Sequence, residues 1–71
     1  MEFIFSISIS YDAFLAYYKG IADKVAITDI HGRNLYVNAK YFRPFLTING
    51  IQGRFKLVLD SNGKYQSLNK L

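Results

Sequence analysis

The sequence predicts a single domain of the α+β class, with one short helix after the first strand, then a curved, mostly antiparallel, barrel-like sheet of short hairpin strands. Three observations predict it. The chain has 71 residues, enough for one core but not for two. Apolar and polar residues alternate along most of it, as in half-buried strands. Turn signals that contain glycine separate these runs at short intervals. We therefore expect one domain over residues 1–71.

The first predicted element is a strand at the N-terminal end of the chain. Large apolar side chains recur there at every second position, as Phe3, Phe5, Ile7 and Ile9. Serine follows each of the last three. Because successive side chains of a strand point to opposite faces, the four apolar residues share one face, which we expect to be buried.

A helix of about nine residues is predicted next, because the apolar period changes to that of a helix. The new pattern places on one helical face Tyr11, Phe14, Leu15 and Tyr18. Ser10 is suited to cap the first turn, since its hydroxyl can accept a hydrogen bond from a free backbone amide. Gly20 is suited to end the helix, because glycine readily adopts a positive φ. Ile21 is then expected to fold back on Leu15 or Ala16.

After the helix the alternation returns, in two short runs around Val25–Ile27 and Leu35–Val37. Asp29 to Gly32, which lies between them, predicts a hairpin turn with the glycine at a positive φ. Residues 39–45 show no alternation and contain the only proline, Pro44. We expect a turn or a single helical turn there, with an aromatic plug at Phe42 and Phe45.

The last third of the chain predicts three more strands. Leu46 to Ile48 is a short one, followed by a turn at Asn49-Gly50. Residues 51–59 form the longest, in which Gly53 indicates a bulge or a close backbone approach. Asn62-Gly63 predicts the last hairpin, and residues 65–68 the final strand.

The composition offers little for catalysis or metal binding. The chain has no cysteine and one histidine, His31, so the usual ligand set of a zinc site is missing. Asp29 and His31 are a candidate acid–base pair, but they lie in a predicted turn, where both residue types are common for backbone reasons. We therefore expect a non-enzymatic protein without a cofactor or a metal.

The hydropathy pattern gives no sign of a membrane segment. No run approaches the roughly 18 apolar residues that span a bilayer. The first residues lack the basic, continuously apolar pattern of a secretory leader. We expect a cytoplasmic protein with no membrane partner.

The charge distribution indicates one candidate surface. Nine Lys or Arg residues against five Asp or Glu give a net charge of +4, and no acidic residue lies between Asp29 and Asp60. Basic and aromatic residues are interleaved in that stretch, as in proteins that bind single-stranded nucleic acid. Phe55 is expected in the core rather than on this surface. The candidate nucleic-acid-binding residues are Arg33, Tyr36, Lys40, Tyr41, Arg43, Arg54 and Lys56.

A second hypothesis is protein association. A small sheet has edge strands, and an edge can pair with a partner protein or with a second copy of the chain. Residues 65–71 are the candidate edge. We therefore expect a binding or interaction domain of unknown partner, with nucleic-acid binding, a homodimer or a protein-partner module as the alternatives.

Several short motifs resemble those of a known family. They are Tyr17-Tyr18-Lys19-Gly20, Phe42-Arg43-Pro44-Phe45, Gly50-Ile51-Gln52-Gly53-Arg54-Phe55 and Ser67-Leu68. Together they resemble the small bacterial family called domain of unknown function 2835, over nearly the whole chain. The resemblance implies an uncharacterised, stand-alone bacterial protein of the cytoplasm, and it carries over no activity and no functional residues.

Overall fold

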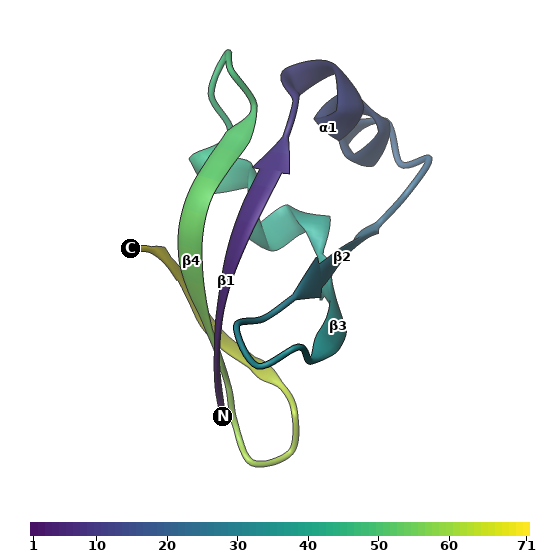
Figure 1. Cartoon of the computed structure of the whole chain (residues 1–71). Coiled ribbons are helices and arrows are strands. Elements are labelled where there is room, and N and C mark those ends of the chain that lie inside the picture. Colours follow the sequence, from purple (N-terminus) through teal and green to yellow (C-terminus); the bar gives the residue numbers. More distant parts are fainter.

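The computed structural model describes all 71 residues. The elements in chain order are β1 (Glu2–Ile9), α1 (Tyr11–Tyr18), β2 (Lys24–Thr28), β3 (Asn34–Asn38), the 3-10 turns η1 (Ala39–Tyr41) and η2 (Arg43–Phe45), β4 (Ile51–Leu59) and β5 (Tyr65–Lys70). They form two antiparallel sheets, β1-β4-β5 and β2-β3 (Figure 1). The predicted α+β class is confirmed, and the predicted sheet is divided in two.

The three-stranded sheet buries one face, as the alternation predicts. Phe5 lies opposite Phe55, and Phe3 lies opposite Leu57, in the pairing of β1 with β4. Leu57 in turn lies opposite Leu68 of β5. All five side chains are buried. The odd-numbered residues of β1 and β4 therefore make the inner face, and their even-numbered neighbours face outward.

An aromatic cluster fills the space behind this sheet. Phe5, Phe42 and Phe55 are almost completely buried, with ring centroids 5.9–6.2 Å apart. Phe42 comes from the junction of η1 and η2, while Phe45 is half-buried and meets Phe55 edge-on. The expected plug and the core position of Phe55 are both confirmed. Edge-to-face contacts of this kind add to the stabilisation by burial alone.

The two sheets meet on one side and stay open on the other. The Ile30 amide donates to the Ile4 carbonyl at 2.8 Å, which ties the β2–β3 hairpin to the outer edge of β1. No strand pairing joins β3 to β5 on the opposite side. The arrangement is therefore an incomplete barrel whose opening lies between these two strands.

Helix α1 covers one end of the sheets (Figure 1). The Ser10 hydroxyl accepts a hydrogen bond from the Ala13 amide, so the predicted cap is confirmed. Of the predicted helical face only Phe14 is fully buried, while Tyr11 and Tyr18 remain exposed. The Ile21 amide donates to the Ala16 carbonyl, so the chain folds back on the helix as predicted, but the Ile21 side chain is 78% exposed and adds little buried surface. No helix has the length and hydropathy to cross a bilayer.

Two local predictions need correction. Leu46 to Ile48 is not a strand, because only Thr47 pairs, in an isolated bridge with Gly50 across the loop residues Ile48 and Asn49. Gly53 does not mark a bulge, since the register shift lies farther along, between Val58 and Leu59. Its missing side chain instead leaves room for Lys70, whose Cε lies 2.8 Å from where a Cβ of Gly53 would be.

Candidate functional site

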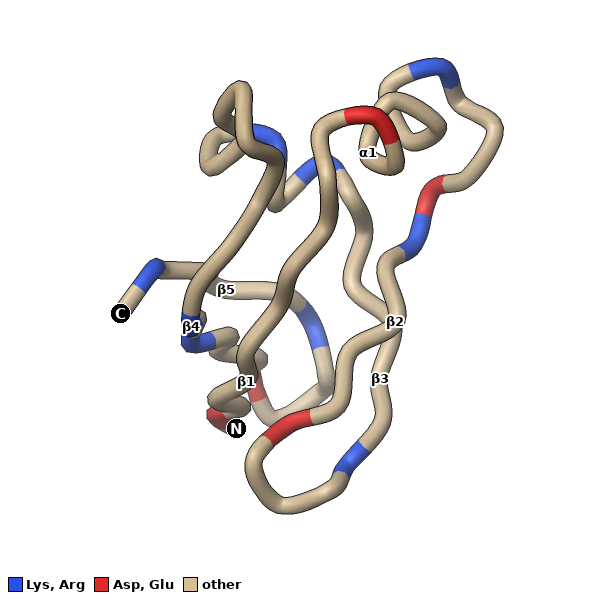
Figure 2. The backbone as a smooth tube through the Cα atoms, turned by 45° about the horizontal axis from the view of Figure 1, so that its top comes forward, with Lys and Arg blue, Asp and Glu red and all other residues tan.

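The seven candidate nucleic-acid-binding residues do not share one face. Lys and Arg are spread around the whole molecule (Figure 2). Arg54 and Lys56 lie on the outer face of β4, opposite the inner face that Leu57 contributes to the core. Arg33 closes the β2–β3 turn at one end, and Arg43 lies in η2. The basic stretch is continuous in the sequence, but the fold disperses it.

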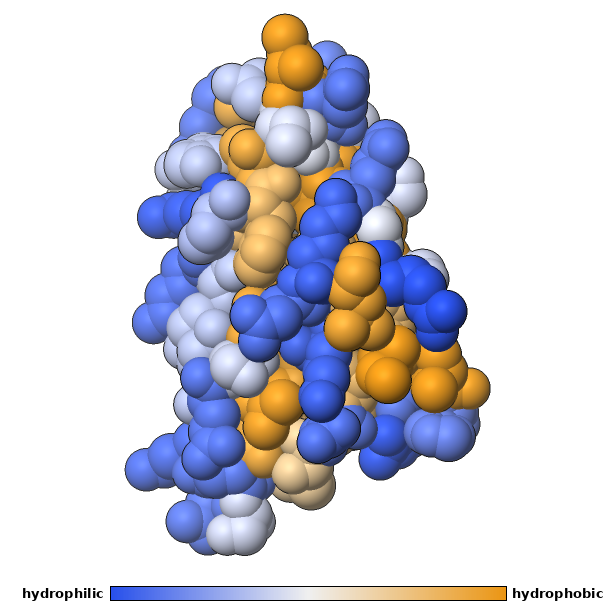
Figure 3. Space-filling view, turned by 90° about the vertical axis from the view of Figure 1, so that its left-hand side faces the viewer, coloured by the Kyte–Doolittle hydropathy of each residue, from blue (hydrophilic) through white to orange (hydrophobic).

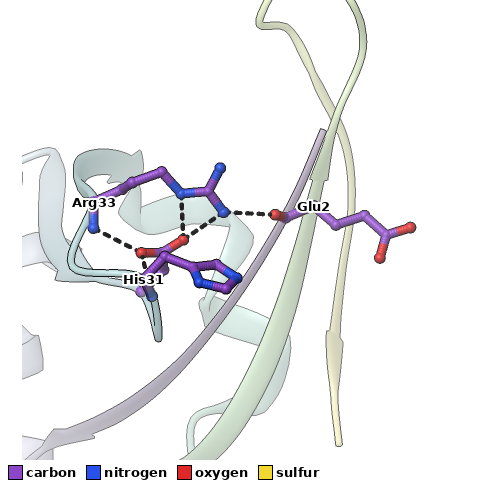
Figure 4. Close-up of polar contacts among 4 residues, drawn as sticks. Glu2, His31 and Arg33 are labelled. Atoms are coloured by element: carbon purple, nitrogen blue, oxygen red, sulfur yellow. Dashed lines mark hydrogen bonds and ion pairs between the residues drawn. The ribbon is translucent and has the colours of Figure 1, made fainter.

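Arg33 and Asp29 form an ion pair that fixes the β2–β3 turn, and we call these two residues the clasp (Figure 4). The Arg33 Nε and Nη2 each donate to Asp29 Oδ2 at 2.6 Å, and Nη2 also reaches the Glu2 carbonyl at 3.2 Å. The guanidinium lies 4.4 Å from the ring centroid of Phe3. Arg33 thereby connects this turn to the start of β1, which gives its charge a structural role.

The Asp29 carboxylate is held in its ionised form by the same turn. Burial opposes ionisation, but the backbone amide and side chain of Arg33 and the backbone amide of His31 donate to it, and together they lower its pKa. The His31 contact comes from the backbone amide, 3.1 Å away. Asp29 therefore bonds to the backbone of His31 and not to its imidazole, unlike the candidate acid–base pair. No group of three or more His, Cys, Asp or Glu side chains gathers as a metal site.

Two further cations are held by partners on different sides of the fold. Lys56 Nζ pairs with Glu2 at 3.2 Å on the outer face of the three-stranded sheet. Arg43 lies over the ring of Tyr18, with its Cζ 5.0 Å from the ring centroid. Seen from the side of β4 and the C-terminus, hydrophilic side chains separate several small apolar patches (Figure 3).

The remaining candidates meet at the opening between β3 and β5. Tyr41 stacks on Tyr65 of β5, with ring centroids 3.6 Å apart and planes within 4°. Lys40 lies beside this pair, with its Nζ 5.1 Å from the Tyr41 centroid. Tyr36 on β3 is 75% exposed. The opening therefore collects three of the seven candidates, two of them aromatic.

A small groove lies along this opening. Its volume is about 130 Å³, and most of its lining is apolar. It is lined by Leu35, Tyr36, Val37, Asn38, Tyr41, Leu57, Leu59, Gly63 and Tyr65. Sites for small-molecule ligands usually measure about 300–1,000 Å³, so this groove is too small for most metabolites. It has room for one large apolar side chain.

The edge of β3 beside the groove carries unpaired backbone groups. The hydrogen bonds at the two ends of the hairpin join Asp29 to Arg33 and Asp23 to Ala39, all odd-numbered residues. In an antiparallel ladder, alternate residues bond to the partner strand. The even-numbered residues of β3, above all Tyr36, therefore direct their N–H and C=O groups away from β2.

Sequence reasoning missed two features of this region. Tyr65 was assigned only to an edge strand, and no local pattern reveals that it stacks on Tyr41 from a separate element. The clasp could have been predicted from a repeated motif. Residues 29–33 and residues 60–64 both have the order Asp-x-x-Gly followed by a basic residue. In both turns the aspartate Oδ1 accepts the backbone amides two and four residues later.

Comparison with known proteins gives one match. The family described as protein of unknown function (DUF2835) matches residues 1–71. The chain belongs to this family. No curated protein and no solved structure matches it. Because the family description assigns no activity, a functional hypothesis depends on the geometry of the chain.

Proposed function

We propose that this member of the family is a non-enzymatic binding domain, which takes up an extended segment of a partner protein along β3. The observation that carries the proposal is the open edge of β3 beside the apolar groove. An extended peptide that pairs with such an edge gains backbone hydrogen bonds, and its alternate side chains enter pockets of the sheet. The groove between Leu35 and Tyr65 is such a pocket.

The order of the strands also leaves space for a strand added beside β3. The β2–β3 hairpin is tied to β1 on one side through Ile30 and Ile4. A strand added to β3 would extend the two-stranded sheet toward β5 and fill part of the opening of the incomplete barrel. Edge strands left open by a fold are sites of pairing with other chains. The added strand would cover Tyr36, which is exposed in the free chain.

Nucleic-acid binding is the second candidate function. Tyr36 is exposed enough to stack on a base, and Lys40 lies close to the groove. Against it, Tyr41 is already stacked on Tyr65, and the other cations lie on different faces. A phosphodiester backbone also offers no amide donors for the carbonyls of β3. These contrasts favour a polypeptide as the occupant.

A matched pair of variants tests the proposal. Tyr36→Pro removes the outward N–H without breaking a bond to β2, since proline is tolerated where an edge N–H faces solvent. Tyr36→Ala keeps that N–H and removes only the ring. A phage-displayed library of random 12-residue peptides is selected on the whole wild-type chain, and the selected peptides are then measured on both variants. Circular dichroism verifies that each variant is folded.

The expected result is a set of peptides that bind the wild type and Tyr36→Ala but lose at least tenfold in affinity on Tyr36→Pro. If no peptide is enriched above the Tyr36→Pro background, the proposed function is wrong. Binding of a mixed-sequence single-stranded RNA that decreases steeply with salt would replace it with the second candidate. A dimer detected by light scattering that Tyr36→Pro does not disperse would indicate self-association through another edge.

A further inference from the structure

We infer that the segment taken up by this domain is acidic, with one large apolar side chain between its acidic residues. The inference rests on the function proposed above and names the chemistry of the partner. Three features support it: the charges beside the groove, the net charge of the chain, and the size and lining of the groove.

Two lysines without an acidic partner are sequence neighbours of residues that line the groove. Lys40 precedes Tyr41 in the chain, and Lys64 lies between Gly63 and Tyr65, all three of which line the groove. Both lysines are exposed, and the two ion pairs of the chain involve neither. The rim is therefore positively charged at both η1 and the β4–β5 turn.

The one acidic residue beside the lining does not neutralise this rim. Asp60 follows Leu59, but its Oδ1 accepts the backbone amides of Asn62 and Lys64 at 2.8 and 2.9 Å. Its carboxylate is thus directed into its own turn. No lining residue is acidic. An acidic segment would therefore meet complementary charges on both sides of the groove, which raises its association rate and its specificity.

The net charge disfavours a second copy as the occupant. Each chain carries a net charge of +4, so two copies repel each other at low salt. The chain also has no acidic residue between Asp29 and Asp60, a stretch that contains all of β3 and β4. A segment of this protein would bring few carboxylates to Lys40 and Lys64. A different, acidic protein fits the rim better.

The interior of the groove is suited to one apolar side chain of the partner. Leu57 and Val37 are buried at its base, with half-buried Leu35 and Leu59 beside them. Burying a CH₂ group is worth about 0.8 kcal/mol, which corresponds to nearly fourfold in affinity. Replacing a central Leu of the bound segment by Ala removes three carbon atoms. We therefore expect this replacement to weaken binding by roughly 10- to 50-fold.

The test uses synthetic nine-residue peptides with blocked ends, built around a library-selected core. One series has Asp at both ends, and a matched series has Lys at the same positions. A third peptide replaces the central apolar residue of the acidic series by Ala. Affinity for the whole chain is measured by isothermal titration at low and high salt. The same titrations are repeated on Lys40→Gln, Lys64→Gln and the control Lys56→Gln, whose lysine pairs with Glu2 on the outer face.

The acidic series should bind at least tenfold more tightly than the basic series, with a difference that shrinks at high salt. Lys40→Gln and Lys64→Gln should each weaken acidic binding by about 1.4- to 5-fold, the range of exposed charge pairs. Lys56→Gln should leave it unchanged. Equal binding of the two series overturns the inference and leaves the proposed function standing, whereas binding by neither series, and no selected core, overturns both.

Discussion

Gly50 is the one glycine that lies directly against other backbone atoms, and its replacement tests how β1, α1 and the loop before β4 fit together. Gly50 is buried at φ +90° against the junction of β1 and α1. A Cβ added there would overlap the Ile9 carbonyl oxygen and lie 2.8 Å from the Ser10 carbonyl carbon. Both are backbone atoms, which cannot rotate away. Gly50→Ala should therefore displace the start of the helix.

Gly32 provides the matched control. It also has a positive φ, +78°, but a Cβ added there would meet nothing within 4 Å. Gly32→Ala should thus lower the free energy of unfolding only by the cost of a left-handed backbone in alanine, about 1–2 kcal/mol. Gly50→Ala adds an overpacking cost of about 1–3 kcal/mol, so its total is about 2–5 kcal/mol. A domain of this length has a stability of roughly 4–11 kcal/mol.

Urea denaturation followed by circular dichroism measures both costs on the same scale. Tyrosine fluorescence supplies an independent signal, because the chain has six tyrosines and no tryptophan. The expected result is a lower midpoint for Gly50→Ala than for Gly32→Ala, with similar slopes. If the two variants lose the same stability, the loop does not pack against Ile9 and Ser10 as described.

Three further outcomes follow from the fold. Folding lowers the pKa of Asp29 from its ordinary value of 3.8, so its contribution to stability is present at neutral pH and is lost as the pH falls through the lowered pKa. Asp29→Asn should flatten this acid-side slope in melting curves measured at different pH values. Phe42→Ala should cost about 3–5 kcal/mol in urea denaturation, and Phe45→Ala clearly less, because only Phe42 is fully buried. Ser10→Ala should cost about 1 kcal/mol and reduce helical circular dichroism, whereas Ser8→Ala should change neither.

Much of the fold could be predicted because its signals are local. The alternation of Phe3 and Phe5 sets the buried face of β1, and the cap at Ser10 sets the start of α1. The predictions that failed or held only in part depend on tertiary contacts. Ile21 folds back on the helix through its backbone amide, but its side chain finds no covering surface and stays exposed. Leu46 to Ile48 has strand-like residues, but only Thr47 finds a pairing partner.

The candidate site was harder to predict, because it is made by elements far apart in the sequence. The basic stretch between Asp29 and Asp60 suggested one surface, but β3 and β4 place its members on different faces. The groove instead depends on the opening between β3 and β5, and on the stack of Tyr41 with Tyr65. Strand order decides both features, and hairpin signals alone do not give the order of strands between hairpins.

Amide hydrogen exchange measured by NMR, with and without a library-selected peptide, tests the central claim most directly. In the free chain the amides of Leu35 and Val37 should exchange slowly, because they bond to β2, and the Tyr36 amide should exchange fast. The bound peptide should slow the Tyr36 amide at least tenfold. If Tyr36 stays fast while amides of α1 or the outer edge of β5 become protected, the partner does not pair with β3 and the account is wrong.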